Sequence, residues 1–64
     1  MGKIRRGGLV FVTWKSDHPP RHVHVYEDGR LLVKWDLDGW KPMKGRATRR
    51  VVELIAALEA EGML

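Results

Sequence analysis

The chain has no cysteine among its 64 residues, which excludes disulfides and thiolate metal sites. Secreted proteins of this size usually need such cross-links, so a reducing cytoplasm suits this chain best. No run approaches the roughly 20 apolar residues that span a membrane, and the basic amino terminus is not followed by the apolar segment of a signal peptide. We therefore expect a cytoplasmic protein that makes no contact with a membrane.

The length allows one domain over residues 1–64. A chain this short buries only about 60% of the surface of its unfolded form, so its core is expected to be a single layer of contacts. Residues 1–8 are basic and contain no apolar alternation, and we expect them to form a flexible terminus.

Positive charge is in excess, because 12 Lys and Arg against 8 Asp and Glu give a formal net charge of +4. A polyanion such as RNA would suit this balance, since each phosphate that is neutralised releases a condensed counterion. The basic residues are spread along the chain among the carboxylates. A solvated surface that keeps a small protein in solution therefore explains the charge equally well.

The first two thirds of the chain predict an antiparallel sheet. Runs rich in β-branched and aromatic residues indicate three strands, namely Leu9–Lys15, a segment from Arg21 or His22 to Tyr26, and Arg30–Leu37. Asp28-Gly29 is the turn signal before the third strand, and Asp38-Gly39 is the turn signal after it. Trp40–Met43 is a candidate fourth strand, which Pro42 confines to an edge.

The remainder predicts one helix. Val51, Leu54, Ile55 and Leu58 follow the spacing i, i+3, i+4, i+7 of an apolar stripe, and core packing is expected for them. Thr48 is the expected N-cap, and Gly62 is placed to end the helix in a left-handed conformation. The predicted fold class is therefore α+β, a three- or four-stranded antiparallel β-meander packed on one face by a single C-terminal α-helix.

The charges of this helix run against its dipole. Arg49 and Arg50 fall in the first turn, and Glu59 and Glu61 in the last, where the opposite signs are favoured. Each such charge costs about a few tenths of a kcal/mol at an exposed site, so the arrangement is tolerable and indicates a surface with another use. Among the tryptophans we expect Trp14 and Trp35 in the core and Trp40, beside a turn, to be the exposed one.

All three histidines lie within seven positions, as His18, His22 and His24, beside the pair Pro19-Pro20. Because His22 and His24 are two apart on an extended strand, their imidazoles project from one face.

The loop that follows decides which face this is. A two-residue loop, Asp28-Gly29, places His22 and His24 on the apolar face, opposite Trp35 and Val33. A three-residue loop with a bulge at Gly29 places them on the wetter face, opposite Lys34 and Leu32. We favour the second, since it gathers Val23, Val25, Leu31, Val33 and Trp35 beneath the helix.

Three kinds of chemistry compete for this cluster. His22 and His24 with His18, Asp17 or Asp36 can supply ligands for zinc, nickel, copper or iron. A histidine beside Arg21 and Lys34 can act as general acid or base on RNA, whose 2′-hydroxyl is its own nucleophile. The histidines, Arg21 and an exposed Tyr26 or Trp40 can also contact phosphates and stack on bases. A purely structural role, with imidazoles bonded to backbone carbonyls or to Asp17, is the alternative to all three.

The run D-H-P-P-R-H-V-H-V, preceded by F-V-T-W and followed by E-D-G-R, an apolar strand, K-G-R-A and a helix, resembles the small bacterial proteins grouped as domain of unknown function 4160. The resemblance extends from about Phe11 to Gly62 and centres on H-P-P-x-H-V-H-V. In the family the proline pair commonly directly precedes the second histidine, whereas Arg21 intervenes here. The matching residues are Asp17, His18, Pro19, Pro20, His22 and His24.

The resemblance implies a compact α+β domain, often encoded beside another small protein as in toxin–antitoxin pairs, and it implies no particular activity. We therefore expect a bacterial binding protein without a cofactor that meets a partner protein or RNA through His18, His22, His24 and Arg21, with Asp17, Lys34 and Asp36 beside them. A small metal-independent ribonuclease that uses His18, His22 or His24 as acid and base is one alternative. A protein that binds a transition metal through the same histidines is the other. The sequence leaves the oligomeric state open.

Overall fold

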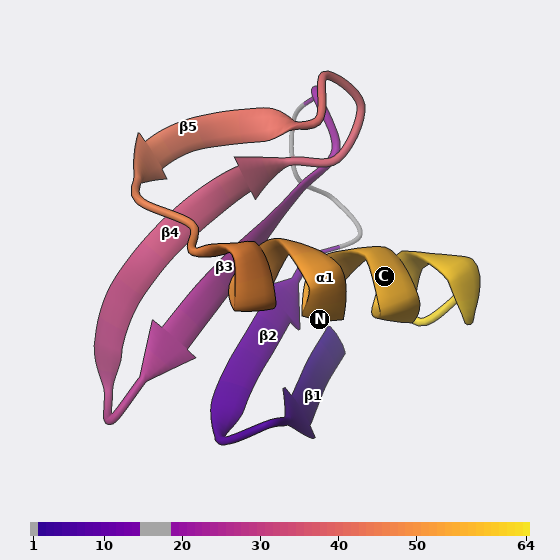
Figure 1. Cartoon of the computed structure of the whole chain (residues 1–64). Coiled ribbons are helices and arrows are strands. Elements are labelled where there is room, and N and C mark those ends of the chain that lie inside the picture. The colour runs from indigo at the N-terminus through magenta and orange to yellow at the C-terminus, as the bar shows by residue number, and fades with distance from the viewer. Residues whose placement is uncertain (1, 15–18) are drawn as a thin grey trace.

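The computed structural model describes residues 2–14 and 19–64. Five strands form one antiparallel sheet in the order β1-β2-β3-β4-β5, and a helix follows them. The elements are β1 (Gly2–Arg6), β2 (Leu9–Thr13), β3 (His22–Glu27), β4 (Arg30–Asp36), β5 (Lys41–Gly45) and α1 (Arg49–Ala60). Figure 1 shows α1 lying across one face of the sheet. The predicted α+β class, meander and C-terminal helix are confirmed, but the strands number five rather than three or four.

The additional strand comes from the basic terminus. The expectation that residues 1–8 are flexible is wrong for Gly2–Arg6, which pairs with β2 along its whole length. Gly7 and Gly8, with φ of 61° and 77°, form a two-residue loop between them, and loops of this type need positive φ at both positions. Ile4 is the one apolar side chain after Gly2 in this strand, so apolar alternation does not reveal it, whereas the glycine pair is a hairpin signal.

The core lies between α1 and the face of the sheet that it covers. Phe11, Val25 and Val33 are successive cross-strand partners and all are completely buried. From α1, Val51, Ile55 and Leu58 pack against them, while Leu54 is half-buried at the margin. Burying an aliphatic or phenyl side chain of this kind contributes about 1.5–3 kcal/mol, so this single layer is what holds α1 on the sheet.

Both predicted ends of α1 are confirmed. The Thr48 hydroxyl accepts the Val51 N–H at 3.3 Å, and Gly62 has a φ of 73°. Past the end of the helix, the Met63 N–H donates to the Leu58 carbonyl at 3.0 Å, which satisfies a carbonyl that the helix leaves without an intrahelical donor. Among the described residues, no helix has the length and apolar character needed to cross a membrane.

Three of the four unfavourable charges of α1 are used in tertiary contacts, and the fourth, Arg49, pairs with Glu53 one turn further along the helix. Nη2 of Arg21 donates to both carboxylate oxygens of Glu59, at 3.0 and 3.1 Å, and Nη2 of Arg6 donates to Glu61 at 3.0 Å. At the other end of the helix, Arg50 donates to the Gly7 carbonyl. These contacts attach α1 to β1 and to the start of β3, which explains why the charges do not follow the helix dipole.

The hairpin between β3 and β4 combines the two predicted loops. Asp28 and Gly29 form a two-residue loop between Glu27 and Arg30, with φ of 51° and 78°. The register then shifts by one residue between Val25 and Tyr26. As a result Val25 faces Val33, and the histidines face Asp36 and Lys34 on the side away from α1.

The bulge has a simple physical cause. Without it, the two-residue loop would turn the valines of β3 away from the helix, because a slip of one residue reverses every side chain. The predicted pairing of His22 with Lys34 and His24 with Leu32 is therefore wrong by two positions, whereas the favoured face of the histidines is confirmed. The expectation that Leu31 joins the apolar face is wrong, because the bulge pairs it with Tyr26 and leaves it 39% exposed.

Candidate functional site

The candidate site is the face of the sheet opposite α1, which we call the open face. A row of cross-strand partners crosses all five strands on this side, namely Lys3, Val12, His24, Lys34 and Lys44. Their neighbours Phe11, Val25 and Val33 point to α1, so alternation directs this row the other way. No helix among the described elements covers the open face (Figure 1).

Four rings gather on the open face, and we call them the aromatic row: Trp14, His22, His24 and Tyr26. His24 is central, with ring centroids 4.8 Å from Trp14, 5.3 Å from His22 and 6.4 Å from Tyr26. Trp14 and His22 meet it edge-on, whereas Tyr26 is nearly parallel to it, at 15°. Three of the rings follow β3 at every second residue, so the aromatic row runs along the middle strand of the sheet.

The three tryptophans differ in their surroundings. Trp35 lies in the core and Trp40 is exposed at the β4–β5 turn, as predicted. The prediction that Trp14 belongs to the core is wrong, because 39% of it is exposed and its ring lies against His24. Trp14 comes two residues after Val12, so alternation directs its ring to the open face and not beneath the helix.

Cations flank the aromatic row on both sides. Lys34 is directly opposite His24 on β4, and Lys44 is the next partner on β5. On the other side, Lys3 lies across Val12 from His24, and Arg5 lies across Val10 from Tyr26. Within the described part of the chain, no carboxylate forms an ion pair with any of these four cations. Their charges are therefore available to a ligand on the open face.

The two other predicted binding residues that the structure describes, Asp36 and Arg21, form hydrogen bonds within the protein. Asp36 is opposite His22 but buried, and its Oδ1 accepts the N–H groups of Asp38 and Gly39 at 2.9 and 2.8 Å, which closes the β4–β5 turn. The Arg21 N–H donates to Asp38, and its side chain holds Glu59 of α1. The side-chain hydrogen bond with Glu59 raises the pKa of Arg21. The candidates Asp17 and His18 lie outside the described residues.

The two described histidines are both oriented by the protein. Nδ1 of His22 lies 2.8 Å from the Pro20 carbonyl oxygen, and since a carbonyl only accepts, Nδ1 donates. This contact fixes the tautomer of the neutral ring, with the lone pair on Nε2. Nδ1 of His24 is buried. In both rings Nδ1 is therefore directed into the protein.

The metal hypothesis gains no ligand set from the described residues. Over 2–14 and 19–64, no three His, Cys, Asp or Glu side chains come together in a way that could hold an ion. The hypothesis relied on His18, Asp17 or Asp36 as the third ligand. The first two lie outside the described residues, and the Asp36 carboxylate accepts two backbone N–H groups.

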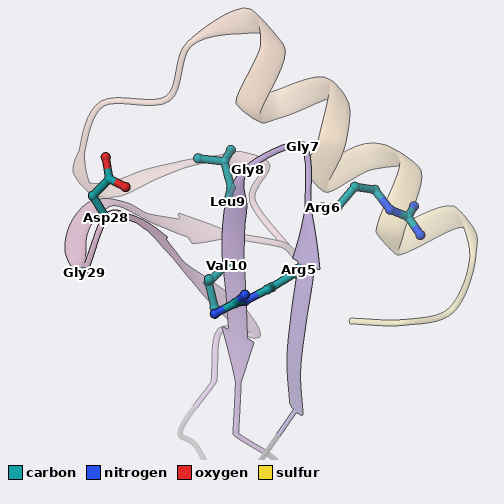
Figure 2. Close-up of a pocket in the computed structure, with 8 residues that line it drawn as sticks. All are labelled: Arg5, Arg6, Gly7, Gly8, Leu9, Val10, Asp28 and Gly29. Atoms are coloured by element: carbon teal, nitrogen blue, oxygen red, sulfur yellow. The ribbon is translucent and has the colours of Figure 1, made fainter.

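A hollow of 450 Å³ lies where the β1–β2 and β3–β4 turns approach each other (Figure 2). Arg5 and Val10 lie side by side along one wall, and the Asp28 carboxylate projects from the other turn (Figure 2). Arg6 instead points toward the end of α1, where Glu61 holds it. Of the two arginines that line this hollow, Arg5 is therefore the one that also belongs to the cations beside the aromatic row.

Comparison of the chain with family models, with curated proteins and with solved structures found no match. The resemblance to the domain of unknown function 4160 proteins thus stays a prediction from the motif. The function is argued from the open face itself.

The sequence motif locates only the centre of this face. His22, His24 and Lys34 are brought together as predicted, but Lys3, Arg5, Lys44 and Trp14 were not among the candidates. What these residues share is their place in the sheet, because each lies on a strand or segment beside β3 or beside one of its neighbours. The register can be read only when the β1 hairpin, the bulge in the β3–β4 pairing and the register shift between Lys34 and Trp35 in the β4–β5 pairing are known.

Proposed function

We propose that this protein binds single-stranded RNA on the open face of its sheet. The observation that carries the proposal is the aromatic row lying between two sets of cations, Lys3 and Arg5 on one side and Lys34 and Lys44 on the other. Bases stack on such rings with about 1–3 kcal/mol each, whatever their sequence. The flanking cations would neutralise the phosphates that connect them.

The spacing of the rings favours a single strand. Nucleotides in a duplex are about 3.4 Å apart along each strand, whereas the centroids along β3 are 5.3 and 6.4 Å apart. A base can rest on each ring only if the strand is extended and its bases are unstacked, as in recognition of single-stranded RNA. The proposal therefore includes discrimination against duplex RNA.

The charge of the open face favours RNA over a protein partner. Its one described carboxylate beside the histidines, Asp36, is buried and occupied by backbone N–H groups. The carboxylates Glu59 and Glu61 are on α1, bound to Arg21 and Arg6. The surface that a ligand would meet is thus cationic and aromatic, which is typical of sheets that bind single-stranded nucleic acid.

Fluorescence anisotropy with a labelled RNA of eight nucleotides tests the proposal. We expect Trp14→Ala and Tyr26→Ala each to weaken binding by about 5- to 150-fold, the equivalent of one lost base stack. Trp40→Ala is the matched control, because Trp40 is equally exposed but lies on the β4–β5 turn against Trp35, and it should leave the affinity unchanged.

Three results would contradict this function: no binding by the wild type, equal affinity for duplex RNA, or an equal loss in the Trp40→Ala and Trp14→Ala variants. Circular dichroism of each variant separates loss of binding from loss of fold. Absence of RNA binding would leave a protein partner as the alternative for the open face.

A further inference from the structure

We propose that the hollow between the β1–β2 and β3–β4 turns selects guanine for one end of the bound RNA strand, with Asp28 as the residue that reads the base. This inference rests on the proposed function, because the rest of the strand must lie along the aromatic row. Stacking on aromatic rings tolerates any base, so a base preference has to come from a polar group beside the row.

The hollow lies next to the last ring of the aromatic row. Tyr26 is that ring, and its cross-strand partner on β2 is Val10, which lines the hollow. Val10 is in turn paired with Arg5 of β1, which lines the hollow as well. Strand β3 ends one residue after Tyr26, at Glu27, and Asp28 follows in the turn. A nucleotide that follows the base on Tyr26 toward this turn would therefore reach the hollow.

Glycines leave room for a base in the hollow. Its volume of 450 Å³ is within the range of about 300–1,000 Å³ that is usual for sites that bind small organic molecules. A Cβ added at Gly8 or at Gly29, one from each turn, would meet nothing within 4 Å. Open space therefore lies against the backbone of both turns, and a planar ring can approach it there.

Asp28 supplies the only carboxylate among the described residues that line the hollow. This carboxylate projects from the β3–β4 turn, away from the wall that Arg5 and Val10 form (Figure 2). Within the described part of the chain it forms no ion pair, either with Arg5 or with any other cation. A negative charge at this position repels phosphates, so its contribution to an RNA site is a contact with the hydrogen-bond donors of a base.

Guanine is the base whose edge suits a single carboxylate. An ionised carboxylate only accepts hydrogen bonds, and its two oxygens accept side by side. The Watson–Crick edge of guanine carries two adjacent donors, N1–H and the 2-amino group, whereas adenine and cytosine carry one amino donor beside an acceptor and uracil carries one N–H between two acceptors. Unpaired bases in single-stranded RNA expose this edge to the protein. Asp28 can therefore pair with guanine through two hydrogen bonds and with each other base through one.

Arg5 is placed to bind the phosphate of the same nucleotide. In a nucleotide the base and the phosphate lie on different sides of the ribose. A guanidinium and a carboxylate that line one hollow without pairing suit these two ends. A phosphate contact carries no sequence information, whereas a contact with a base edge does. We therefore expect Arg5 to contribute to affinity and Asp28 to base choice.

The test compares single-stranded RNA octamers by fluorescence anisotropy with the full chain. The reference is an octamer of uridines, and two series replace its first or its last uridine with guanosine, adenosine or inosine, with the label at the opposite end. In one series we expect the wild type to bind the guanosine octamer about 5- to 150-fold more tightly than the adenosine octamer, the factor of one bidentate base contact. Inosine keeps N1–H but lacks the 2-amino group, so its octamer should have an intermediate affinity.

The variants separate base choice from general affinity. Asp28→Asn should abolish the preference for guanosine, because the amide replaces one acceptor with a donor. Asn tolerates the positive φ of 51° at this position as Asp does, and binding of the uridine octamer shows that the variant folds. Arg5→Ala should weaken the guanosine and adenosine octamers by the same factor. Glu27→Gln is the control, because it removes the same charge from the neighbouring residue, which lines a different hollow beside Thr48 and Val51, and it should keep the preference.

Each outcome decides between the two claims. Equal affinity of the wild type for the guanosine and adenosine octamers, or a preference for adenosine, overturns this inference and leaves the proposed function standing. Absence of binding to every octamer overturns both. A guanosine preference that persists in Asp28→Asn, or that Glu27→Gln abolishes, also overturns the inference, because another group would then read the base.

Discussion

The dependence of RNA affinity on salt gives a quantitative test of the cations on the open face. Lys3, Arg5, Lys34 and Lys44 are the four that flank the aromatic row. Each phosphate neutralised on a single strand contributes about −0.7 to the slope of log K against log salt concentration. Four contacts therefore predict a slope of about −2.8, which corresponds to a loss of affinity of about 50-fold between 50 and 200 mM salt.

The perturbation is the double variant Lys34→Ala, Lys44→Ala. Two contacts remain on the β1 side, so the slope should fall to about −1.4 and the loss over the same range to about 7-fold. Anisotropy titrations at four salt concentrations measure both slopes. Arg49→Ala is the charge-matched control, since Arg49 lies on α1 beside Glu53. The reasoning would be refuted if the double variant kept the full slope or if Arg49→Ala reduced it by as much as one lysine.

Three further predictions concern the fold that supports this face. Gly45→Ala should unfold the domain, because the added Cβ would lie 2.2 Å from the Leu32 carbonyl oxygen. Gly8→Ala should cost only about 1–3 kcal/mol, because Gly8 also has a positive φ but a Cβ there meets nothing within 4 Å. Equal urea midpoints for the two variants would contradict this. Ile55→Val should lower stability by about 1 kcal/mol and Tm by about 4–8 °C, and an unchanged Tm would mean that Ile55, fully buried here, is not in the core. The hydrogen bond from Arg6 lowers the pKa of Glu61, so the contribution of this pair to folding stability is present above the unfolded-state pKa and lost as pH falls through the lower folded-state pKa. The difference in urea midpoint between wild type and Glu61→Gln should therefore be seen at pH 7 and vanish in acid. A difference that grows in acid would contradict the assigned sign.

The elements that local rules decide could be predicted from the sequence. The stripe of α1, its Thr48 cap and its Gly62 end each depend on residues within a few positions of one another, and all three are as expected. The strand β1 could not be predicted from apolar alternation, because its place in the sheet depends on the Gly7-Gly8 loop and on pairing with β2.

The centre of the candidate site was predictable, and its extent was not. The spacing of His22 and His24 on an extended strand is a local property, so their common face follows from the sequence. The bulge in the β3–β4 pairing is not local, since it is required by the burial of Val23, Val25, Val33 and Trp35 together. Arg21 was expected beside the histidines, yet its side chain contacts Glu59 of α1, which lies 38 positions further along the chain. Local sequence rules do not reveal a partner at that separation.

The most direct test of the account is to map RNA onto the protein by NMR. Titration of isotope-labelled protein with a single-stranded RNA of eight nucleotides should shift the indole signal of Trp14, the imidazole signals of His22 and His24 and the ring signals of Tyr26. Signals of α1 residues such as Glu53 should stay in place. Shifts confined to α1 or to the Trp40 turn, with the aromatic row unmoved, would contradict the claim that the open face is the binding surface.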